Sequence, residues 1–551
     1  MNGALLLLIA VALFAVGYFV YARYIEKLLG IDPKRPTPAH TKNDGVDFVP
    51  ASSTVLFGHH FATIAGAGPI VGPVLAAQFG WLSVTMWVVL GCIFIGALHD
   101  MISLFLSVRN SGESIGSVIG TLLGRPGKIM FLLVSWTGLV LVIAEFNRQI
   151  AGTFIADPAT ATSSLLFIVE AVLFGLCVYK WRISVVLASL IFVPLMFVFV
   201  WIGNVIPFDL VKLLGITPDL ARIVWILFLL LYCFIASTCP VQFLLQPRDY
   251  LNAYLLYVMM ALGVLGVLVA HPVLNIDAFA GFSAVGKSGA SDMLFPFLFV
   301  TVACGACSGF HALVASGTSS KQISNERSIR PVGYGGMLLE GVLAMIALIG
   351  VAGTYACQKD YVSAIQTMEP VQMFASTIAG FCVKIGIPQR IAESFMLLAV
   401  AAFLMTTVDS STRLARFTWQ ELMPNKKGIA GNMYVATFIV CAIVAGFLLG
   451  SPAAAKQLWT LFASTNQMLA SLALLTATLW FYRNGKPCWM TAIPMVLMFG
   501  VSAWALASIL VSAASSGQWI RLVASSFLLM LAVSLVVVAV SKARSSNEVS
   551  L

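Results

Sequence analysis

The sequence predicts an all-α polytopic membrane protein with about fifteen transmembrane helices, arranged as inverted repeats that contain two broken helices. Three observations predict this class. Of the 551 residues, 60% are hydrophobic and 10% are charged, whereas soluble domains carry about 25% charged residues. The apolar runs have the length of bilayer-crossing helices rather than of the short alternating strands of an outer-membrane barrel. Two of these runs are interrupted in the middle.

The first interrupted run covers residues 57–81 and reads FGHHFATIAGAGPIVGPVLAAQFGW. In a helix interior a glycine costs about 1 kcal/mol and a proline about 3 kcal/mol, and lipid offers no partner to the freed backbone groups. Such a break is expected where it lines a cavity, as in the substrate sites of secondary transporters. A kink or a small-residue packing face is the alternative. The candidate substrate-binding residues of this break are Gly66, Ala67, Gly68, Pro69 and Gly72.

The second interrupted run covers residues 295–320 and reads FPFLFVTVACGACSGFHALVASGTSS. Two interrupted spans in corresponding positions of two halves are the best sequence indication of a transporter binding site. The candidate substrate-binding residues of this break are Cys304, Gly305, Ser308, Gly309 and His311.

The distribution of basic residues predicts the topology. With the N-terminus outside, most of the 31 lysines and arginines fall in inner loops and the C-terminus is cytoplasmic. Arg248 is one of these inner-loop residues, just before a span expected at 251–271. The net charge of +9 is then explained without nucleic-acid binding. The two interrupted spans run in opposite directions, as an inverted repeat requires. We expect an N-terminal helix and inner linker at 1–54, a first half at 55–271 broken near 66–73, and a second half at 293–541 broken near 304–309. Repeats of five or of seven helices both fit.

Ionisable residues inside the spans are expected to face a cavity or a partner, because their burial in lipid is costly. For the neighbours His99 and Asp100 the alternatives are a polar lock between helices and a proton relay, since histidine titrates near neutral pH. The same two alternatives, a polar lock between helices and a proton relay, apply to Glu340. Asp409 is interpreted first as a helix cap or a partner of Arg413. The candidate proton-coupling residues are His59, His60, His99, Asp100, Glu145, Glu340 and Asp409.

Arg148 and Glu145 lie three residues apart, so they share a helix face and can pair. If this pair is not only structural, Arg148 is a candidate for holding a substrate carboxylate, because its planar guanidinium matches a carboxylate with two hydrogen bonds. Glu170 stands alone in an apolar run and is either a proton carrier or a hydrogen-bond partner of a neighbouring helix.

The ten cysteines predict neither a metal centre nor a disulfide framework. Cys304, Cys307 and His311 have suitable ligand types, but a structural zinc site needs four ligands. Small residues are also expected where substrate approaches the backbone. Cys357 and Cys382 fall in one predicted outer loop and could pair in an oxidising space. No phosphate-binding loop is present, so neither a cofactor nor ATP-driven transport is expected.

Several stretches resemble the carbon starvation protein A (CstA) family, over about residues 50–480. They are FGHHFATIAGAGPIVGP at 57–73, CGACSGFHALVASGTSSKQ at 304–322, YGGMLLEGVLAMIAL at 334–348, DSSTRLARF at 409–417 and LWTLFASTNQML at 458–469. The resemblance implies a bacterial inner-membrane nutrient importer with the LeuT-like core of the amino acid–polyamine–organocation transporters. Members are linked to peptide uptake in starvation and to proton-coupled pyruvate uptake. The resemblance places His59, His60, Gly66, Gly68, Pro69, His311, Glu340 and Asp409 in family-like motifs without assigning their roles.

These observations favour a secondary active symporter that imports a small organic anion such as pyruvate with protons. The half-helix N-termini at the breaks would offer N–H groups to a carboxylate. A di- or tripeptide transporter is the alternative within this class. A membrane nutrient sensor and a membrane enzyme are alternatives from other classes, although no nucleophile motif accompanies His99 and Asp100. The expected partners are the substrate, protons and the lipid bilayer, and a homo-oligomer remains open.

Overall fold

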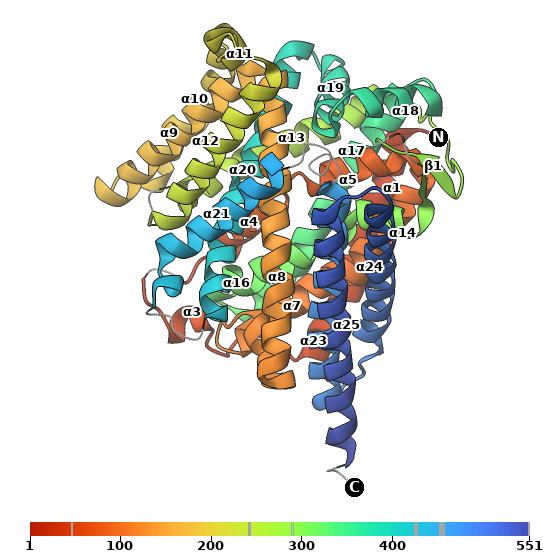
Figure 1. The fold of residues 1–551 in the computed structure, drawn as a ribbon. Helices are drawn as coiled ribbons and strands as arrows, with labels where there is room; N and C mark the ends of the chain where they lie inside the picture. Colours follow the sequence, from red (N-terminus) through yellow and green to blue (C-terminus); the bar gives the residue numbers. More distant parts are fainter. Residues whose placement is uncertain are drawn as a thin grey trace.

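The computed structural model describes residues 1–45, 48–240, 244–287, 289, 291–423, 428–450 and 458–548. Almost all of them form helices, and the two ends of the chain lie at opposite ends of the molecule (Figure 1). We call the end with α11, α18 and α19 the α19 face, and the opposite end with α3 the α3 face. The short elements at these faces are α3 (Pro38–Thr41), α11 (Leu210–Leu214), α18 (Gln358–Thr367) and α19 (Pro370–Val383).

Thirteen helices in the described part of the chain are long and apolar enough to cross a membrane. The bent pair α4–α5 raises this number to 14, close to the predicted fifteen, and the multi-pass, all-helical class is confirmed. Four of these spans contain a π-helical turn. One turn joins α1 to α2, one joins α6 to α7, one follows α9 and one precedes α17. The spanning helices are α1 (Gly3–Val16) with α2 (Ala22–Leu29), α6 (Trp81–Gly91) with α7 (Ala97–Arg109), α8 (Ile115–Ala156), α9 (Pro158–Gly175), α10 (Val185–Val205), α12 (Pro218–Thr238), α13 (Leu245–Ala270), α17 (Gly336–Thr354), α20 (Gln389–Leu422), α21 (Met433–Gly450), α23 (Leu458–Arg483), α24 (Trp489–Ser515) and α25 (Trp519–Glu548).

The first interrupted span consists of α4 (Ser53–Ile64) and α5 (Gly68–Ala76), and its two parts are bent by 45°. The break is shorter and earlier than the predicted one near 66–73. Pro69 lies in the first turn of α5, where its missing N–H costs nothing. Gly72 and Pro73 therefore lie within α5 instead of in the unwound segment.

The second interrupted span has two interruptions. It consists of α14 (Leu294–Thr301), the single turn α15 (Ala303–Ala306) and α16 (Gly309–Gly317). Cys307 and Ser308 have extended backbone between α15 and α16, so the predicted break near 304–309 is confirmed at its C-terminal part. A two-stranded hairpin of β1 (Ser283–Val285) and β2 (Ser291–Met293) precedes this span, with Ser283 opposite Met293.

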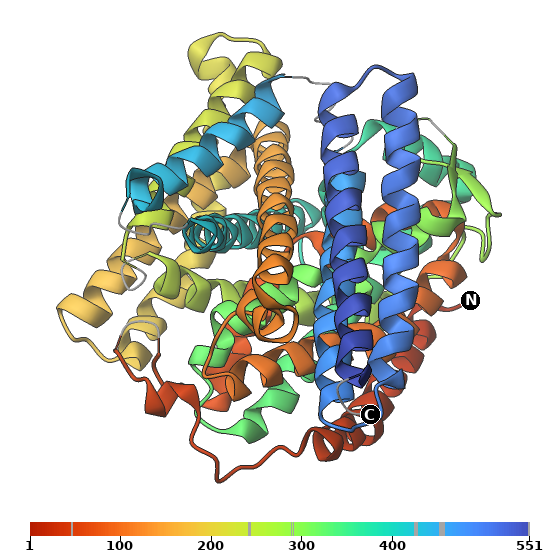
Figure 2. The same cartoon turned by 60° about the horizontal axis from the view of Figure 1, so that its bottom comes forward.

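The long helices α8, α20 and α23 lie in the buried centre of the molecule, where α8 packs on both α20 and α23. Figure 2 shows α24 and α25, in blue, side by side at the periphery. The helices α10, α21, α24 and α25 are largely uncovered by protein, as expected for helices that face lipid. The polar residues around the two breaks therefore lie inside the bundle, and the outer surface of the bundle is apolar.

The packing of the helices shows a recurring pattern. Helix α13 packs on α4 and on α20, while α23 packs on α16 and on α8. Helix α12 packs on α8, and α21 packs on α20. The α9–α10 hairpin packs mainly on itself and on one side of this set. The first broken span thus packs with α13, which contacts the central helix α20. The second broken span packs with α23, which contacts the central helix α8.

Candidate functional site

The two breaks contact each other through residues without side-chain bulk. A Cβ atom on Gly68 would overlap the Cβ and Sγ atoms of Cys304. A Cβ on Gly72 would lie 2.6 Å from the carbonyl oxygen of Thr301. Glycine at both positions lets α5 pack directly on the second interrupted span. This contact brings Gly66, Ala67, Pro69 and the Cys304–Gly305 pair into one region, as the sequence predicted.

The second break is also held from the side of α6 and α7. The thiol of Cys92, in the π-helical turn between these helices, donates to the carbonyl of Gly305 at 3.0 Å. Gly96 allows close approach, because a Cβ there would collide with the carbonyl oxygen of Ala306. Gly309 is packed equally closely against the backbone of α23 at Asn466. The second break is therefore fixed by backbone contacts on two sides.

The N-termini of the two half-helices differ in capping. Asn466 of α23 accepts from the backbone N–H of Phe310 at 2.8 Å and donates to Ser308 Oγ at 3.0 Å. It also donates to the sulfur of Cys304 at 3.4 Å. Neither the N-cap residue Ala67 nor another side chain among the described residues accepts from the N–H groups at the N-terminus of α5. The positive end of the α5 dipole is thus less neutralised than that of α16.

His311, in the first turn of α16, lies in a buried cluster of acids and histidines. Its Nδ1 lies 2.8 Å from Asp100 Oδ2, and His99 Nδ1 lies 2.7 Å from Asp100 Oδ1. His311 Nε2 lies 3.2 Å from Glu340 Oε2, a pair with ion-pair separation but without hydrogen-bond geometry. All four side chains are at most 1% exposed. Residues that the sequence singled out separately on α7, α16 and α17 are thus in direct contact.

The two neighbouring histidines of α4 point to different partners. His60 is fully buried, and its Nδ1 lies 2.7 Å from Ser319 Oγ, while its Nε2 has no hydrogen-bond partner among the described residues. His59 lies 3.5 Å from Asp249 Oδ2 of α13 and keeps 22% of its side chain exposed. These contacts connect the half-helix α4 to the segment after α16 and to α13.

Asp409 pairs with a cation that the sequence analysis assigned to an inner loop. The guanidinium of Arg248 on α13 donates to Asp409 Oδ2 and to the hydroxyl of Tyr232, which itself donates to Asp409 Oδ2 at 2.8 Å. Arg248 and Asp409 are buried in the middle of the bundle. Asp409 lies inside α20, so its interpretation as a helix cap is wrong. Its direct partner is Arg248, and Arg413, one turn further along α20, also acts on it electrostatically. The polar run at 246–249 placed the start of α13 too late, which hid Arg248.

One side chain of α20 faces the first break. The hydroxyl of Thr407 lies 2.8 Å from the position that a Cβ of Gly66 would occupy. This hydroxyl is buried and has no hydrogen-bond partner among the described residues. Other buried threonines, such as Thr412 and Thr476, donate to the carbonyl four residues earlier. The sequence analysis did not single out Thr407, since a threonine inside an apolar helix carries no distinctive signal.

Arg148 belongs to a chain of charges near the α19 face. It contacts Glu145 with two hydrogen bonds, at 3.1 and 2.7 Å, which confirms the predicted pair. Its third nitrogen lies 4.0 Å from Glu369, which in turn lies 2.7 Å from Lys287 in the β1–β2 hairpin. Burial opposes the ionisation of Glu369, but Arg148 and Lys287 together hold its pKa below the ordinary value. The chain ties α8 to α19 and to the hairpin.

Glu170 on α9 is 1% exposed, and neither carboxyl oxygen has a hydrogen-bond partner among the described residues. It lies apart from the breaks, on the α9–α10 hairpin. Glu170 therefore remains a separate buried acid, and neither of its two predicted roles is tested by the structure.

Cys357 and Cys382, for which the sequence allowed a disulfide, are both free thiols. Cys357 is an exposed thiol at the start of α18, and Cys382 is a buried thiol in α19 whose Sγ faces the carbonyl of Leu262. Within the described residues no group of three potential ligands could hold a metal ion. Cys304 instead occupies the close contact between the two interrupted spans, and Cys307 lies against Gly96 between α6 and α7.

Comparisons with known proteins agree along almost the whole chain. A family model described as Carbon starvation protein CstA matches residues 2–362 and 353–505. "Peptide transporter CstA" of Campylobacter jejuni is 35% identical over 557 residues, which cover 90% of this chain and 78% of that one. "Peptide transporter CstA" of Bacillus subtilis is 32% identical and covers 86% and 84% of the two chains. "Pyruvate/proton symporter BtsT" of Escherichia coli is 30% identical over 580 residues, with coverages of 90% and 80%.

A search of solved structures finds a more distant likeness. The "Crystal structure of MhsT in complex with L-phenylalanine" aligns with a TM-score of 0.48 and 12% sequence identity, and covers 89% of this chain and 99% of that one. A likeness at this level says nothing about substrate.

Proposed function

This chain belongs to the carbon starvation protein CstA family, and on that premise we propose that it is a secondary active transporter that imports pyruvate together with protons. We place it in the bacterial inner membrane, with the N-terminus outside and the C-terminus in the cytoplasm. In this proposal the chain is a carrier, neither an enzyme nor a sensor. The α19 face is then the outer face and the α3 face is the inner one.

The observation that carries the proposal is the position of His311 between two carboxyl groups. An imidazole with a carboxyl group close to each ring nitrogen is favoured as the imidazolium, because both carboxylates stabilise its positive charge. With Asp100 and Glu340 both ionised, the three groups carry one net negative charge, and one more proton makes them neutral. Because an uncompensated buried charge is costly, the closed cluster favours the proton-loaded form. Access of water to α16 would favour proton release.

The cluster is adjacent to the breaks, which supports coupling between the proton and the substrate. His311 lies two residues after Gly309, at the start of the half-helix that leaves the second break. A movement of α16 that opens the break would change the distances to Asp100 on α7 and Glu340 on α17. The free energy of protonation is then linked to the conformation of the broken span.

We place the substrate carboxylate at the first break, beside Gly66 and Gly68. Two features support this position: the N-terminus of α5 lacks a side-chain cap, and the unpartnered hydroxyl of Thr407 faces Gly66. Helix N-termini bind anions through backbone N–H groups and the helix dipole. Arg148 is a weaker candidate in this state, because Glu145 already occupies its guanidinium with two hydrogen bonds.

We further propose a division into two five-helix inverted repeats. The first contains the α4–α5 span, the α6–α7 span, α8, α12 and α13, within the half at 55–271. The second contains the α14–α16 span, α17, α20, α21 and α23, within the half at 293–541. The equivalent contacts of α13 with α4 and of α23 with α16 support this assignment. The α9–α10 hairpin is then an insertion between the third and fourth helices of the first repeat.

Peptide uptake is the second candidate function. The relatives named peptide transporters reach 35% identity, above the 30% of the named pyruvate symporter. The buried acids Asp100 and Glu340 could bind a peptide amine. The direct contact of Gly68 with Cys304 favours the smaller substrate, because a peptide needs the two spans to separate.

The experiment that tests the proposal is uptake by the purified protein in liposomes with an inward proton gradient. Labelled pyruvate and a labelled dipeptide are offered separately, at equal membrane potential. We expect pyruvate to accumulate and a protonophore to abolish the accumulation. Accumulation of the dipeptide alone would assign the chain to peptide transport. Uptake of neither substrate would contradict both candidates and favour a sensor.

A further inference from the structure

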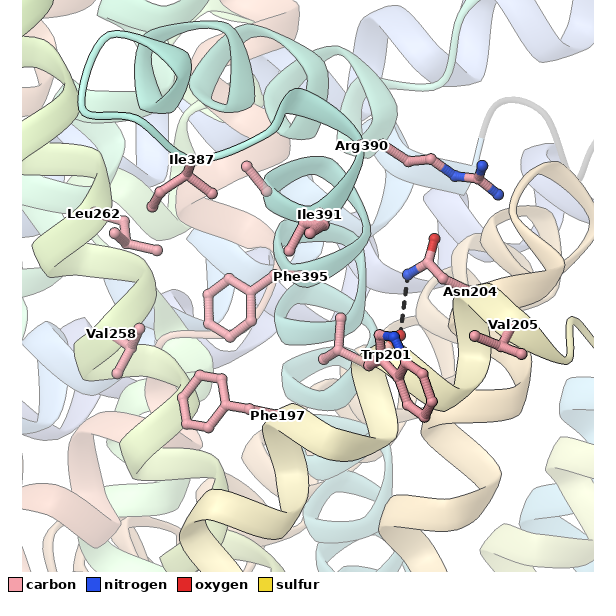
Figure 3. Close-up of a pocket in the computed structure, with 12 residues that line it drawn as sticks. Phe197, Trp201, Asn204, Val205, Val258, Leu262, Ile387, Arg390, Ile391 and Phe395 are labelled. Atoms are coloured by element: carbon pink, nitrogen blue, oxygen red, sulfur yellow. Dashed lines mark hydrogen bonds between the residues drawn. The ribbon is translucent and has the colours of Figure 1, made fainter.

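A groove of about 410 Å³ opens between α10, α13 and the beginning of α20 (Figure 3). Its walls are almost entirely apolar, and Phe197 and Phe395 stack at 5.8 Å across it. Val200 and Ala392 form part of its buried wall. The groove separates the α9–α10 hairpin from the core helix α20.

The groove has a polar end. Arg390, in the first turn of α20, and Asn204, near the end of α10, stand together at one end of it, whereas Phe197 and Val258 lie toward the other (Figure 3). Arg390 is exposed, and no ion pair or hydrogen bond of its guanidinium occurs among the described residues. Asn204 is already engaged with Val200 and Ser394. Arg390 is therefore a cation available at the mouth of an apolar groove.

The groove lies at a depth where lipid is the surrounding medium. Its walls come from membrane-spanning helices, and its polar end lies where α10 ends and α20 begins. Trp201, on the groove's rim, is 65% exposed, and exposed tryptophans are typical of the boundary between headgroups and acyl chains. An occupant with an apolar body and an anionic end at this boundary has the chemistry of a phospholipid.

We propose that this groove binds an anionic phospholipid, with one acyl chain between α10 and α20 and the phosphate on the guanidinium of Arg390. A zwitterionic lipid would share the apolar contacts but would gain less from the cation, because its own ammonium partly neutralises the phosphate. The bound chain would fill the space between the α9–α10 hairpin and α20. Since α20 carries Thr407 and Asp409, the lipid would support the helix that faces the first break.

The test is native mass spectrometry of the purified protein with phosphatidylglycerol or phosphatidylcholine of identical acyl chains. We expect a one-lipid adduct that favours phosphatidylglycerol. Arg390→Gln should reduce this adduct roughly tenfold, the value of a charge-assisted hydrogen bond to phosphate. Lys384→Gln removes an exposed cation of the same face that does not line the groove, and should leave the adduct unchanged. Ala392→Phe should reduce the adducts of both lipids, because the ring fills the groove.

Inorganic phosphate serves as the control for a site that needs only the headgroup. We expect it neither to bind nor to displace the lipid. Equal phosphatidylglycerol binding by the wild type and Arg390→Gln would overturn the proposal, as would loss of binding in Lys384→Gln alone. Unchanged lipid binding in Ala392→Phe would overturn the placement of the acyl chain. None of these measurements depends on transport, so their failure would leave the proposed function untouched.

Discussion

The two broken spans meet in the centre of the molecule, but their half-helices begin differently. The N-terminus of α16 is capped by Asn466, and its first turn presents His311 to Asp100 and Glu340. The N-terminus of α5 has no side-chain cap and faces Thr407 across Gly66. A satisfied helix end beside a titratable cluster suits proton binding, whereas an open helix end suits an anion. In the proposed function, the second break therefore carries the proton site and the first break binds the substrate carboxylate.

The largest effect is expected from Gly68→Ala, because a Cβ there would collide with Cys304 where the two breaks touch. Overpacking of this kind costs about 1–3 kcal/mol, and we expect a lower Tm and near-complete loss of accumulation. Gly152→Ala, with no atom within 4 Å of the added Cβ, is the matched control. Cys304→Gly should partly rescue Gly68→Ala. Identical Tm and uptake for Gly68→Ala and Gly152→Ala would show that the breaks do not touch in this way.

A large effect on coupling, without loss of the fold, is expected from Glu340→Gln. The amide cannot release a proton, so accumulation against a gradient should fall by roughly tenfold or more, while counterflow exchange of substrate persists. His99→Ala should weaken the dependence of uptake on pH, because it removes one hydrogen bond from Asp100. Glu113→Gln, at an exposed acid, is the control. Full proton-driven uptake by both variants would contradict the assignment of the proton site to this cluster.

A smaller effect distinguishes carboxylate binding at the N-terminus of α5 from binding at the N-terminus of α16. Asn466→Asp keeps an acceptor for the N–H of Phe310 but adds a negative charge at α16. If the substrate carboxylate binds at α5, the KM for pyruvate should rise only a few-fold, through long-range repulsion. Asn466→Ala should lower stability by about 1 kcal/mol, the usual value of an N-cap. The measurements are uptake kinetics and thermal unfolding. Loss of all binding in Asn466→Asp would move the carboxylate to α16.

The smallest effect concerns the charges near the α19 face. The pKa of Glu369 is held below its ordinary value, so its contribution to stability is present above the unfolded pKa and is lost as pH falls through the folded one. The Tm difference between the wild type and Glu369→Gln should therefore be positive at pH 7 and shrink as the pH falls below about 4.5. Because the side chain is 40% exposed, we expect a difference of only about 1–2 °C. A constant difference across this range would contradict the role of its charge.

Composition and spacing were sufficient to predict the class, the approximate number of spans and the two spans that are interrupted. Apolar runs of helix length can be satisfied only by helices in a bilayer, and the clusters of small residues and proline that begin at Gly66 and Gly305 indicate where those helices are interrupted. The Glu145–Arg148 pair was also predictable, because a spacing of three residues places both side chains on one helix face. These features depend on neighbours within a few residues along the chain.

The partners of the buried charges depend on how distant helices pack. Asp100 and His311 are 211 residues apart, and Arg248 and Asp409 are 161 apart. No periodicity along one helix indicates which helix will face it, so Arg248 was assigned to a loop and its pairing with Asp409 was not predicted. Local sequence establishes which segments must lie in the membrane and where they cannot stay helical. Helix packing then selects the pairs, because a buried charge is tolerated only where the fold brings it a counter-charge.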